Sequence, residues 1–284
     1  MTYMKLENVC VDFPIYGGTS RSLKNSLVHV GTGGRLATDA ANRKVVNALQ
    51  HITLDVREGD RIGLIGGNGA GKTTLLRVMA GIYEPTKGAY SRLGHIVPLF
   101  GGSLGMNLEL PGVENIVQRG RVLGLSSKQI KSQIDEIIDF TELEHFIHLP
   151  MRTYSAGMRV RLAFAITTAV DADILLLDEG LGAGDEGFRA KAANRLAGFI
   201  SRAGILVLAT HSASLMRQFC DQGLWLDHGE ARMRGDMTNV LLQYREHTNP
   251  GHATRGLEEK KARKRAAPDT QLEGGDAKKS AASG

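Results

Sequence analysis

A glycine-rich stretch in the first third of the chain has the residue types and spacing that bind phosphate. It fits the P-loop pattern of a glycine, four residues, and then Gly-Lys followed by Ser or Thr. Its glycines let successive backbone N–H groups converge on phosphate oxygens at the positive end of a helix. Lys72 is predicted to reach the β- and γ-phosphates, and the Thr73 hydroxyl to take a Mg²⁺ position. The simpler alternative is a glycine-rich turn with no ligand. The residues are Gly66, Gly67, Asn68, Gly69, Ala70, Gly71, Lys72, Thr73 and Thr74.

An acidic pair, Asp178 and Glu179, follows the apolar run Ile174–Leu177. Such a run is typical of a buried parallel strand. An Asp at the end of a strand beside a P-loop is placed to hold Mg²⁺, directly or through water. Glu179 is then placed to polarise an attacking water as a general base. In the alternative, the two carboxylates are only solvent-exposed groups at the end of a strand. This is less favoured because Lys72 already indicates a nucleotide.

A second anion site is predicted shortly before this strand. The stretch Tyr154–Ala165 is predicted to be a helix that begins with a turn of small residues. Ser155, Ala156 and Gly157 form that turn. The Ser155 hydroxyl and the Gly157 N–H group are predicted to bind an anion at the helix N-terminus.

The elements that must position these groups follow from hydrophobic periodicity and from turn residues. The long stretch Tyr16–Asn42 is predicted to be a loop with one short helix near residues 22–28. The predicted strands are Leu6–Phe13, Val45–Val56, Arg61–Ile65, Ile174–Leu177 and Ile205–Ala209, and Gly223–Glu230 is predicted to be a strand followed by a turn. The predicted helices are Thr74–Ala80, which Gly81 ends, then Pro111–Leu123, Ser127–Phe140 with Ser126 or Ser127 as its cap, and Met237–Tyr244 with Asp236 as its cap.

Residues from about 101 to 152 are predicted to be helical, with Ile130, Ile134, Ile137 and Ile138 on one face of a helix. This arrangement indicates a helical insertion between two halves of a nucleotide-binding α/β core.

Composition limits the remaining possibilities. The 284 residues are 42% hydrophobic and 23% charged, which is ordinary for a globular protein, and no apolar run approaches the length of a membrane span. Cys10 and Cys220 are predicted to be small buried hydrophobes in a reducing compartment rather than a disulfide or metal ligands. The net charge of +5 is modest, and the basic run Lys260–Arg265 is predicted to be part of a solvated tail. Residues 247–284 are predicted to be disordered.

The order of these motifs is specific: P-loop, helical insertion, Ser-x-Gly turn, Asp-Glu strand, and then His211 after another strand. It resembles the ATP-binding cassette (ABC) ATPase family over about residues 4–244. Tyr154–Met158 is similar to the signature motif of that family, with Ala156 and Met158 in place of its commonest Gly and Gln. The tyrosine opening and the Arg-Leu-Ala-Phe-Ala continuation resemble the branch whose members export lipid-linked polysaccharides such as O-antigen, capsule, teichoic acid and cell-wall galactan.

The resemblance implies an α/β P-loop NTPase core of the ABC type, with an antiparallel β subdomain and the helical insertion, over residues 1–246. It implies that His211 contacts the γ-phosphate and that Asp185, in the loop 182–185, communicates with a second copy. Phe13 is the first candidate for stacking on adenine, and Tyr16 is the second. One departure is that residues 98–102 contain no Gln where most relatives have one that contacts Mg²⁺ and water.

The implied function is that of an ATPase subunit on the cytoplasmic face of the inner membrane. Two copies would sandwich ATP with Mg²⁺ and drive two separate transmembrane permease subunits that export a lipid-linked polysaccharide. The alternatives are an ABC ATPase for another cargo, a non-transport ABC protein that acts on nucleic acid or ribosomes, and a P-loop kinase or GTPase. Nucleic acid is not expected as a partner, because no second cassette or long coiled coil is predicted. The stretch after Tyr244 has no strand pattern, so we also expect glycan selectivity to lie outside this chain.

Overall fold

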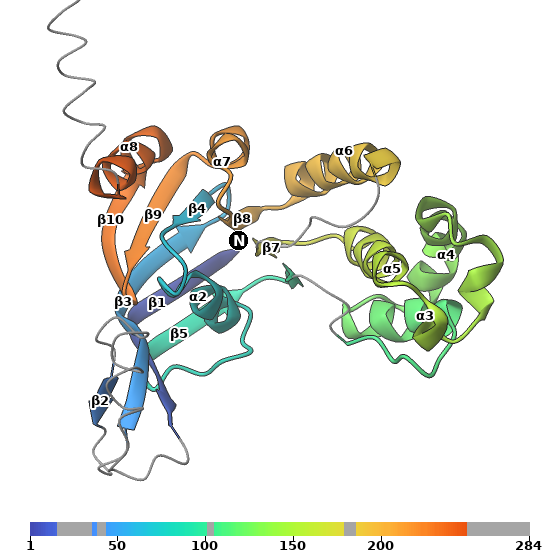
Figure 1. Ribbon diagram of the computed structural model, residues 1–284, viewed down its shortest axis with the longest axis horizontal. Coiled ribbons are helices and arrows are strands. Elements are labelled where there is room, and N and C mark those ends of the chain that lie inside the picture. Colours follow the sequence, from blue (N-terminus) through green and yellow to red (C-terminus); the bar gives the residue numbers. More distant parts are fainter. Residues whose placement is uncertain (16–35, 39–43, 101–104, 179–185, 249–284) are drawn as a thin grey trace, which may run out of the picture. The chain divides into compact units, whose positions relative to one another are not determined.

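The computed structural model describes residues 1–15, 36–38, 44–100, 105–178 and 186–248 (Figure 1). The chain divides into two compact units, Met1–Tyr244 and Arg245–Gly284, and the account below concerns the first. The described strands of this unit form one four-stranded and one six-stranded sheet. They are β1 (Tyr3–Pro14), β2 (Leu36–Thr38), β3 (Lys44–Arg57), β4 (Arg61–Ile65), β5 (Lys87–Leu93), β6 (Ile96–Leu99), β7 (Ile174–Leu177), β8 (Ile205–Ala209), β9 (Gln222–Asp227) and β10 (Glu230–Asp236).

The four-stranded sheet has the order β2-β3-β1-β5 and is antiparallel throughout. Strands β1 and β3 are the two long strands that the sequence predicts before the P-loop, and they pair from Tyr3 opposite Arg57 to Pro14 opposite Val45. Strand β2 lies inside the stretch that we expected to be loop, because three residues are too few to show a periodicity. This sheet is the expected antiparallel β subdomain.

The six-stranded sheet has the order β10-β9-β4-β8-β7-β6, and all its strands except β10 run parallel. Every residue of β7 and β8 is buried, as their continuous apolar runs predict. Strand β4, which leads into the P-loop, lies between the parallel strands β9 and β8. The α/β class with a P-loop core is therefore confirmed.

Residues 105–153 are mainly helical, which confirms the expected insertion between β6 and the later core strands. Ser126 caps one of these helices with a complete capping box: its hydroxyl accepts the Gln129 N–H, and the Gln129 side chain accepts the Ser126 N–H. The helices are α2 (Lys72–Met79), α3 (Gly112–Val122), α4 (Ser127–Thr141), α5 (Ala156–Thr168), α6 (Glu186–Arg202), α7 (Ala213–Phe219) and α8 (Met237–Thr248), with the short 3-10 helices η1 (Glu144–His148) and η2 (Met151–Thr153).

The apolar faces of these elements form two buried clusters. Ile130 and Ile137 are buried in one of them, and Ile134 and Ile138 pack against it, so the predicted face of α4 is confirmed. Cys10 and Cys220 are both free and buried, as expected. The predicted short helix near residues 22–28 lies outside the described residues. Among the described helices, none combines the length and apolar character needed to cross a bilayer.

Candidate active site

The P-loop connects the buried strand β4 to α2, which begins at Lys72. The Lys72 ammonium donates to the carbonyl oxygens of Gly66 at 2.6 Å and Gly67 at 3.0 Å. Lys72 is only 9% exposed, yet the next residue, Thr73, is exposed. The loop therefore folds over its own lysine, and the ammonium lies beside the backbone groups that are predicted to surround phosphate.

Two neighbouring segments hold the loop in place. A Cβ atom at Gly71, where φ is +108°, would lie 3.0 Å from both the Ala48 carbonyl oxygen and Leu49 Cδ2 in β3. The Ala70 carbonyl accepts the Gly229 N–H at 3.0 Å, from the turn between β9 and β10. By contrast, a Cβ atom at Gly67 or Gly69 would have no neighbour within 4 Å. The loop is thus supported on one side and open at the two glycines that are available to approach a ligand.

The parallel sheet brings the other predicted groups to the same edge. Strand β4 pairs with β8, and β8 pairs with β7, with Leu64 opposite Ala209 and Leu177 opposite Leu208. The P-loop follows β4, His211 follows β8 and Asp178 follows β7. Three adjacent strands therefore deliver the lysine loop, the histidine and the carboxylate to one sheet edge, where parallel α/β sheets bind ligands.

The second predicted anion site is the N-terminus of α5. Ser155 is the N-cap of this helix, and its exposed hydroxyl accepts the Met158 N–H at 3.2 Å. The preceding residue, Tyr154, is 3% exposed, and its hydroxyl donates to the Phe146 carbonyl at 2.7 Å. Burial raises the pKa of Tyr154 above its ordinary value. The tyrosine therefore anchors the turn while the serine faces solvent.

Ser155 lines a concavity of about 410 Å³ together with residues from the end of α4, from η1 and from the first turns of α5. The other lining residues are Glu142, Leu143, Phe146, Gly157, Met158 and Arg161. The concavity is formed by the helical insertion and α5, so the second anion site is built separately from the P-loop.

Phe13 lies near the end of β1 and is 37% exposed. Its ring meets that of Tyr83 edge-on, with centroids 5.3 Å apart, and Tyr83 accepts a hydrogen bond from Arg77 at 2.8 Å. Val11, two residues earlier in β1, pairs with Leu49, which contacts the P-loop at Gly71. Phe13 is therefore a partly exposed aromatic ring on the strand next to the one that supports the phosphate loop.

The side chains available at the sheet edge fit a nucleotide with Mg²⁺. The hydroxyl of Thr73 and the carboxylate of Asp178 are oxygen donors of the kind that Mg²⁺ prefers. Gly67 and Gly69 are exposed, and this part of the loop is open to a ligand such as phosphate. Three predicted site residues, Tyr16, Glu179 and Asp185, lie outside the described residues.

Sequence reasoning missed one buried polar residue in the helical insertion. Asn115 is 1% exposed, and its amide nitrogen donates to the carbonyl oxygens of Asn107, Leu110 and Pro111 while its oxygen accepts the Asn107 N–H. It thereby fixes the segment that leads into α3. A single Asn in a helical pattern carries no signal of this role, because Asn is equally common on exposed turns.

Comparison with known proteins identifies the family to which the chain belongs. Residues 49–182 match the family model described as ABC transporter. The O-antigen export system ATP-binding protein RfbE of Yersinia enterocolitica is 44% identical over 81% of this chain and 96% of that protein. RfbB of Myxococcus xanthus, of the same description, is 39% identical over 81% of this chain but only 52% of its own length. A teichoic acids export ATP-binding protein, TagH of Staphylococcus epidermidis, is 33% identical over 85% of this chain and 87% of that protein.

Solved structures agree on the fold. The ATP-binding cassette MJ0796, in a dimeric post-hydrolysis state with ADP and Pi, superposes with a TM-score of 0.60 over 82% of this chain and 98% of that chain. An ATP-binding subunit of an ABC transporter superposes with a TM-score of 0.62 over 85% and 93%. Both are 20% identical to this chain and support the fold alone. With the P-loop and strand-end geometry above, these similarities place the chain in the family of ABC transporter ATP-binding proteins, and it is an ATP-hydrolysing enzyme of that family.

Proposed function

We propose that this chain powers the export of a lipid-linked polysaccharide of the O-antigen type. It would act at the cytoplasmic face of the inner membrane, as two copies bound to two separate permease subunits. The observation that carries the proposal is the 44% identity to RfbE across nearly all of that exporter protein, combined with the strand-end site. The additional relatives from teichoic acid export favour the same class of cargo, an envelope polymer.

Within one copy, the residues at the sheet edge divide the work. Lys72 exchanges its contacts with the Gly66 and Gly67 carbonyls for phosphate oxygens, at which a charged donor forms a strong hydrogen bond. Thr73 and Asp178 would hold Mg²⁺, which neutralises phosphate charge when bound. Glu179 accepts a proton from the attacking water, and His211 contacts the γ-phosphate. Phe13 is the preferred partner for the adenine ring, with Tyr16 as the second candidate.

A second copy completes the phosphate cage. Ser155 and the backbone N–H of Gly157 lie at an exposed helix N-terminus, where the helix dipole favours a negative group. We assign this terminus to the γ-phosphate of ATP held by the other copy, and Asp185 to communication between the two copies. ATP binding then draws the copies together, and hydrolysis releases them.

The dimer is tested in a hydrolysis-deficient background. The Glu179→Gln protein should remain monomeric without nucleotide and become dimeric with ATP and Mg²⁺ on size-exclusion chromatography. Adding Ser155→Arg should abolish the ATP-dependent dimer, because a bulky cation replaces the small hydroxyl that approaches phosphate. Ser155→Ala is the matched control and should weaken dimerisation without abolishing it. Unchanged dimerisation of the Ser155→Arg variant would contradict the assigned role of this helix terminus.

The cargo is tested in cells. Depleting the protein should cause lipid-linked glycan to accumulate on the cytoplasmic side while glycan synthesis initially continues. Re-expression of the parent should restore surface glycan, whereas re-expression of Lys72→Ala should not. Normal surface glycan after depletion would contradict the assignment of this cargo class.

A further inference from the structure

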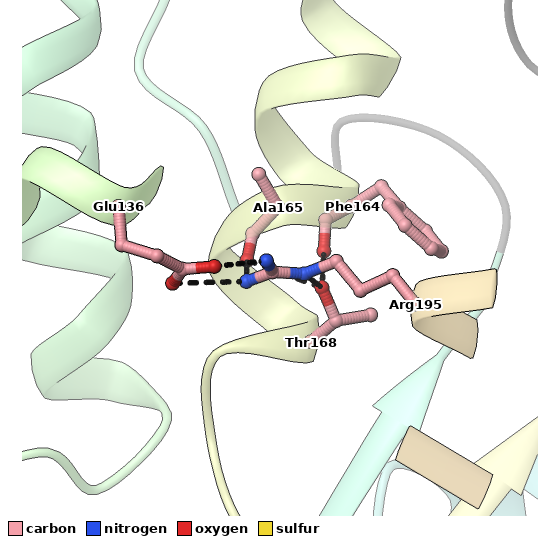
Figure 2. Close-up of polar contacts among 5 residues, drawn as sticks. All are labelled: Glu136, Phe164, Ala165, Thr168 and Arg195. Atoms are coloured by element: carbon pink, nitrogen blue, oxygen red, sulfur yellow. Dashed lines mark hydrogen bonds and ion pairs between the residues drawn. The ribbon is translucent and has the colours of Figure 1, made fainter. Parts of the chain in front are cut away.

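An arginine outside the nucleotide site joins three helices (Figure 2). Arg195 lies on α6, and its side chain is only 16% exposed. Its guanidinium forms a two-pronged ion pair with Glu136 of α4, in which Nη2 lies 3.3 Å from Glu136 Oε2. On the other side, Nε donates to the Thr168 hydroxyl of α5 at 2.6 Å. One side chain thus contacts α4 and α5 from a third helix.

The contacts with α5 are made at the C-terminal end of that helix. Arg195 Nη2 donates to the Ala165 carbonyl at 3.4 Å, and the Thr168 hydroxyl donates to the Phe164 carbonyl at 2.8 Å (Figure 2). Carbonyl groups in the last turn of a helix lack intrahelical partners. A cation near them also interacts favourably with the negative end of the helix dipole. Arg195 is therefore matched to α5 by charge as well as by hydrogen bonding.

The Arg195 guanidinium also lies over an aromatic ring. The Arg195 guanidinium lies 4.4 Å from the centroid of Phe140 in α4, and Lys191 of α6 lies 5.1 Å from the same centroid. Phe140 also packs against Phe164 of α5 and Phe188 of α6, with centroids 6.0 Å and 5.3 Å apart. Cation–π contact is strongest where the cation is shielded from water, as it is for Arg195. We call Glu136, Phe140, Thr168 and Arg195 the α6 clasp.

The clasp joins the two parts of the chain that act on different ATP molecules in the proposed dimer. Helix α5 is capped at its N-terminus by Ser155, which faces the ATP of the other copy in the proposed dimer. Helix α6 is the next described element after β7 and Asp178, which serve the ATP of the same copy. The residues between Asp178 and α6 include Glu179 and Asp185. A fixed contact between α5 and α6 would therefore couple the position of Ser155 to the position of α6.

We propose that Arg195 is a positioning residue that holds α5 in register with α6, so that dimer closure and hydrolysis are coupled. This inference rests on the proposed function, because it requires that Ser155 acts on the ATP of a second copy. It does not place Arg195 in contact with nucleotide. It predicts that loss of the clasp weakens closure and turnover while leaving ATP binding by a single copy unchanged.

The planar fork of arginine suits this role better than an ammonium group does. It contacts a carboxylate, a hydroxyl, a carbonyl and a ring at once, whereas lysine offers a point charge on a flexible stem. Arg195→Lys should therefore retain part of the effect, and Arg195→Met should retain almost none.

The test uses the full chain with four variants: Arg195→Met, Arg195→Lys, Glu136→Gln and Arg202→Met. Arg202→Met is the matched control, because Arg202 lies on the same helix in an exposed ion pair with Asp171 at 3.6 Å. Three quantities are measured: kcat for ATP hydrolysis, the affinity of the monomer for a fluorescent ATP analogue, and the ATP concentration for half-dimerisation in the Glu179→Gln background. Glu136→Gln removes the charge that pairs with Arg195 and changes an exposed residue. It therefore keeps the test valid if Arg195→Met does not fold.

We expect Arg195→Met to lower kcat and raise the half-dimerisation concentration by about three- to thirtyfold, the size of typical coupling changes between sites. Arg195→Lys and Glu136→Gln should fall between this variant and the parent. Monomer affinity for the analogue, and all three values for Arg202→Met, should stay within about twofold of the parent. If Arg195→Met and Glu136→Gln match Arg202→Met in a parent that hydrolyses ATP and dimerises, the clasp inference is wrong. If the parent itself does neither, the proposed function is wrong, and this inference with it.

Discussion

Alanine substitutions at three P-loop glycines should affect protein stability and ATP binding to different extents. At Gly66 the φ angle is +154°, and a Cβ atom would lie 2.3 Å from the Leu226 carbonyl oxygen and 2.8 Å from Ala70 Cβ. Leu226 is inside β9, so its backbone has little freedom to move. We expect Gly66→Ala to lower the free energy of unfolding by roughly 2–5 kcal/mol, as the sum of backbone strain and overpacking.

Two neighbouring glycines provide the matched comparison. At Gly69 the φ angle is +73° but a Cβ atom would meet nothing within 4 Å, so Gly69→Ala should cost only the backbone strain, roughly 1–2 kcal/mol. At Gly67 an added Cβ atom would also meet nothing within 4 Å, and φ lies outside the left-handed region. Gly67→Ala should therefore change the free energy of unfolding by less than about 0.5 kcal/mol. Its added methyl group should nevertheless weaken ATP binding, because Gly67 lies in the open part of the loop.

Urea unfolding of the three alanine variants measures the stability order, and equilibrium titration with a fluorescent ATP analogue measures binding. The predicted order of destabilisation is Gly66→Ala, then Gly69→Ala, then Gly67→Ala. A Gly66→Ala variant as stable as Gly69→Ala would show that the close approach to Leu226 does not constrain the loop. A Gly67→Ala variant that binds the analogue as the parent does would refute the ligand part of the reasoning.

Three further predictions follow from burial and composition. Asn115→Leu should lower the free energy of unfolding by about 1–3 kcal/mol, because it leaves the Asn107 N–H without its acceptor and removes the hydrogen bonds of the amide to three carbonyls; parental stability in urea unfolding would contradict this. Cys10 and Cys220 should react slowly with a thiol reagent at pH 8 in the native protein and rapidly in urea, since both are buried and burial raises the pKa of Cys220 to about 12; one fast native thiol would count against it. Truncation before Gly251 should leave ATP hydrolysis intact, and loss of activity in a folded truncated protein would refute the prediction that the tail is dispensable for hydrolysis.

The sequence predicted best those elements whose signal is local. The P-loop strand and helix, the buried strands β7 and β8, and the Ser126 cap each depend on a few consecutive residues with a fixed chemical pattern. The order of the motifs then indicated the family. The structure adds the pairing of β4, β8 and β7, which brings three separate motifs to one edge.

The elements that sequence reasoning missed lack such a local pattern. Strand β5 has no buried residue, so no apolar alternation marks it, and its pairing with β1 alone makes it a strand. Helix α6 was not predicted, and the contact of its Arg195 with Glu136 spans 59 residues of sequence. An arginine on a helix is usually a solvated charge, and only the packing of α4 and α5 against it distinguishes Arg195.

The central claim is that this chain hydrolyses ATP with Lys72 as a phosphate ligand and Glu179 as the general base. The most direct measurement compares ATP affinity and single-turnover hydrolysis for Lys72→Ala, Glu179→Gln and the parent. Lys72→Ala should lose affinity, because a charged contact with the phosphates is removed. Glu179→Gln should bind ATP as the parent does and hydrolyse it more slowly by about 10²–10⁴-fold, because an amide cannot accept the proton from water. Hydrolysis by Glu179→Gln at the parental rate would contradict the account.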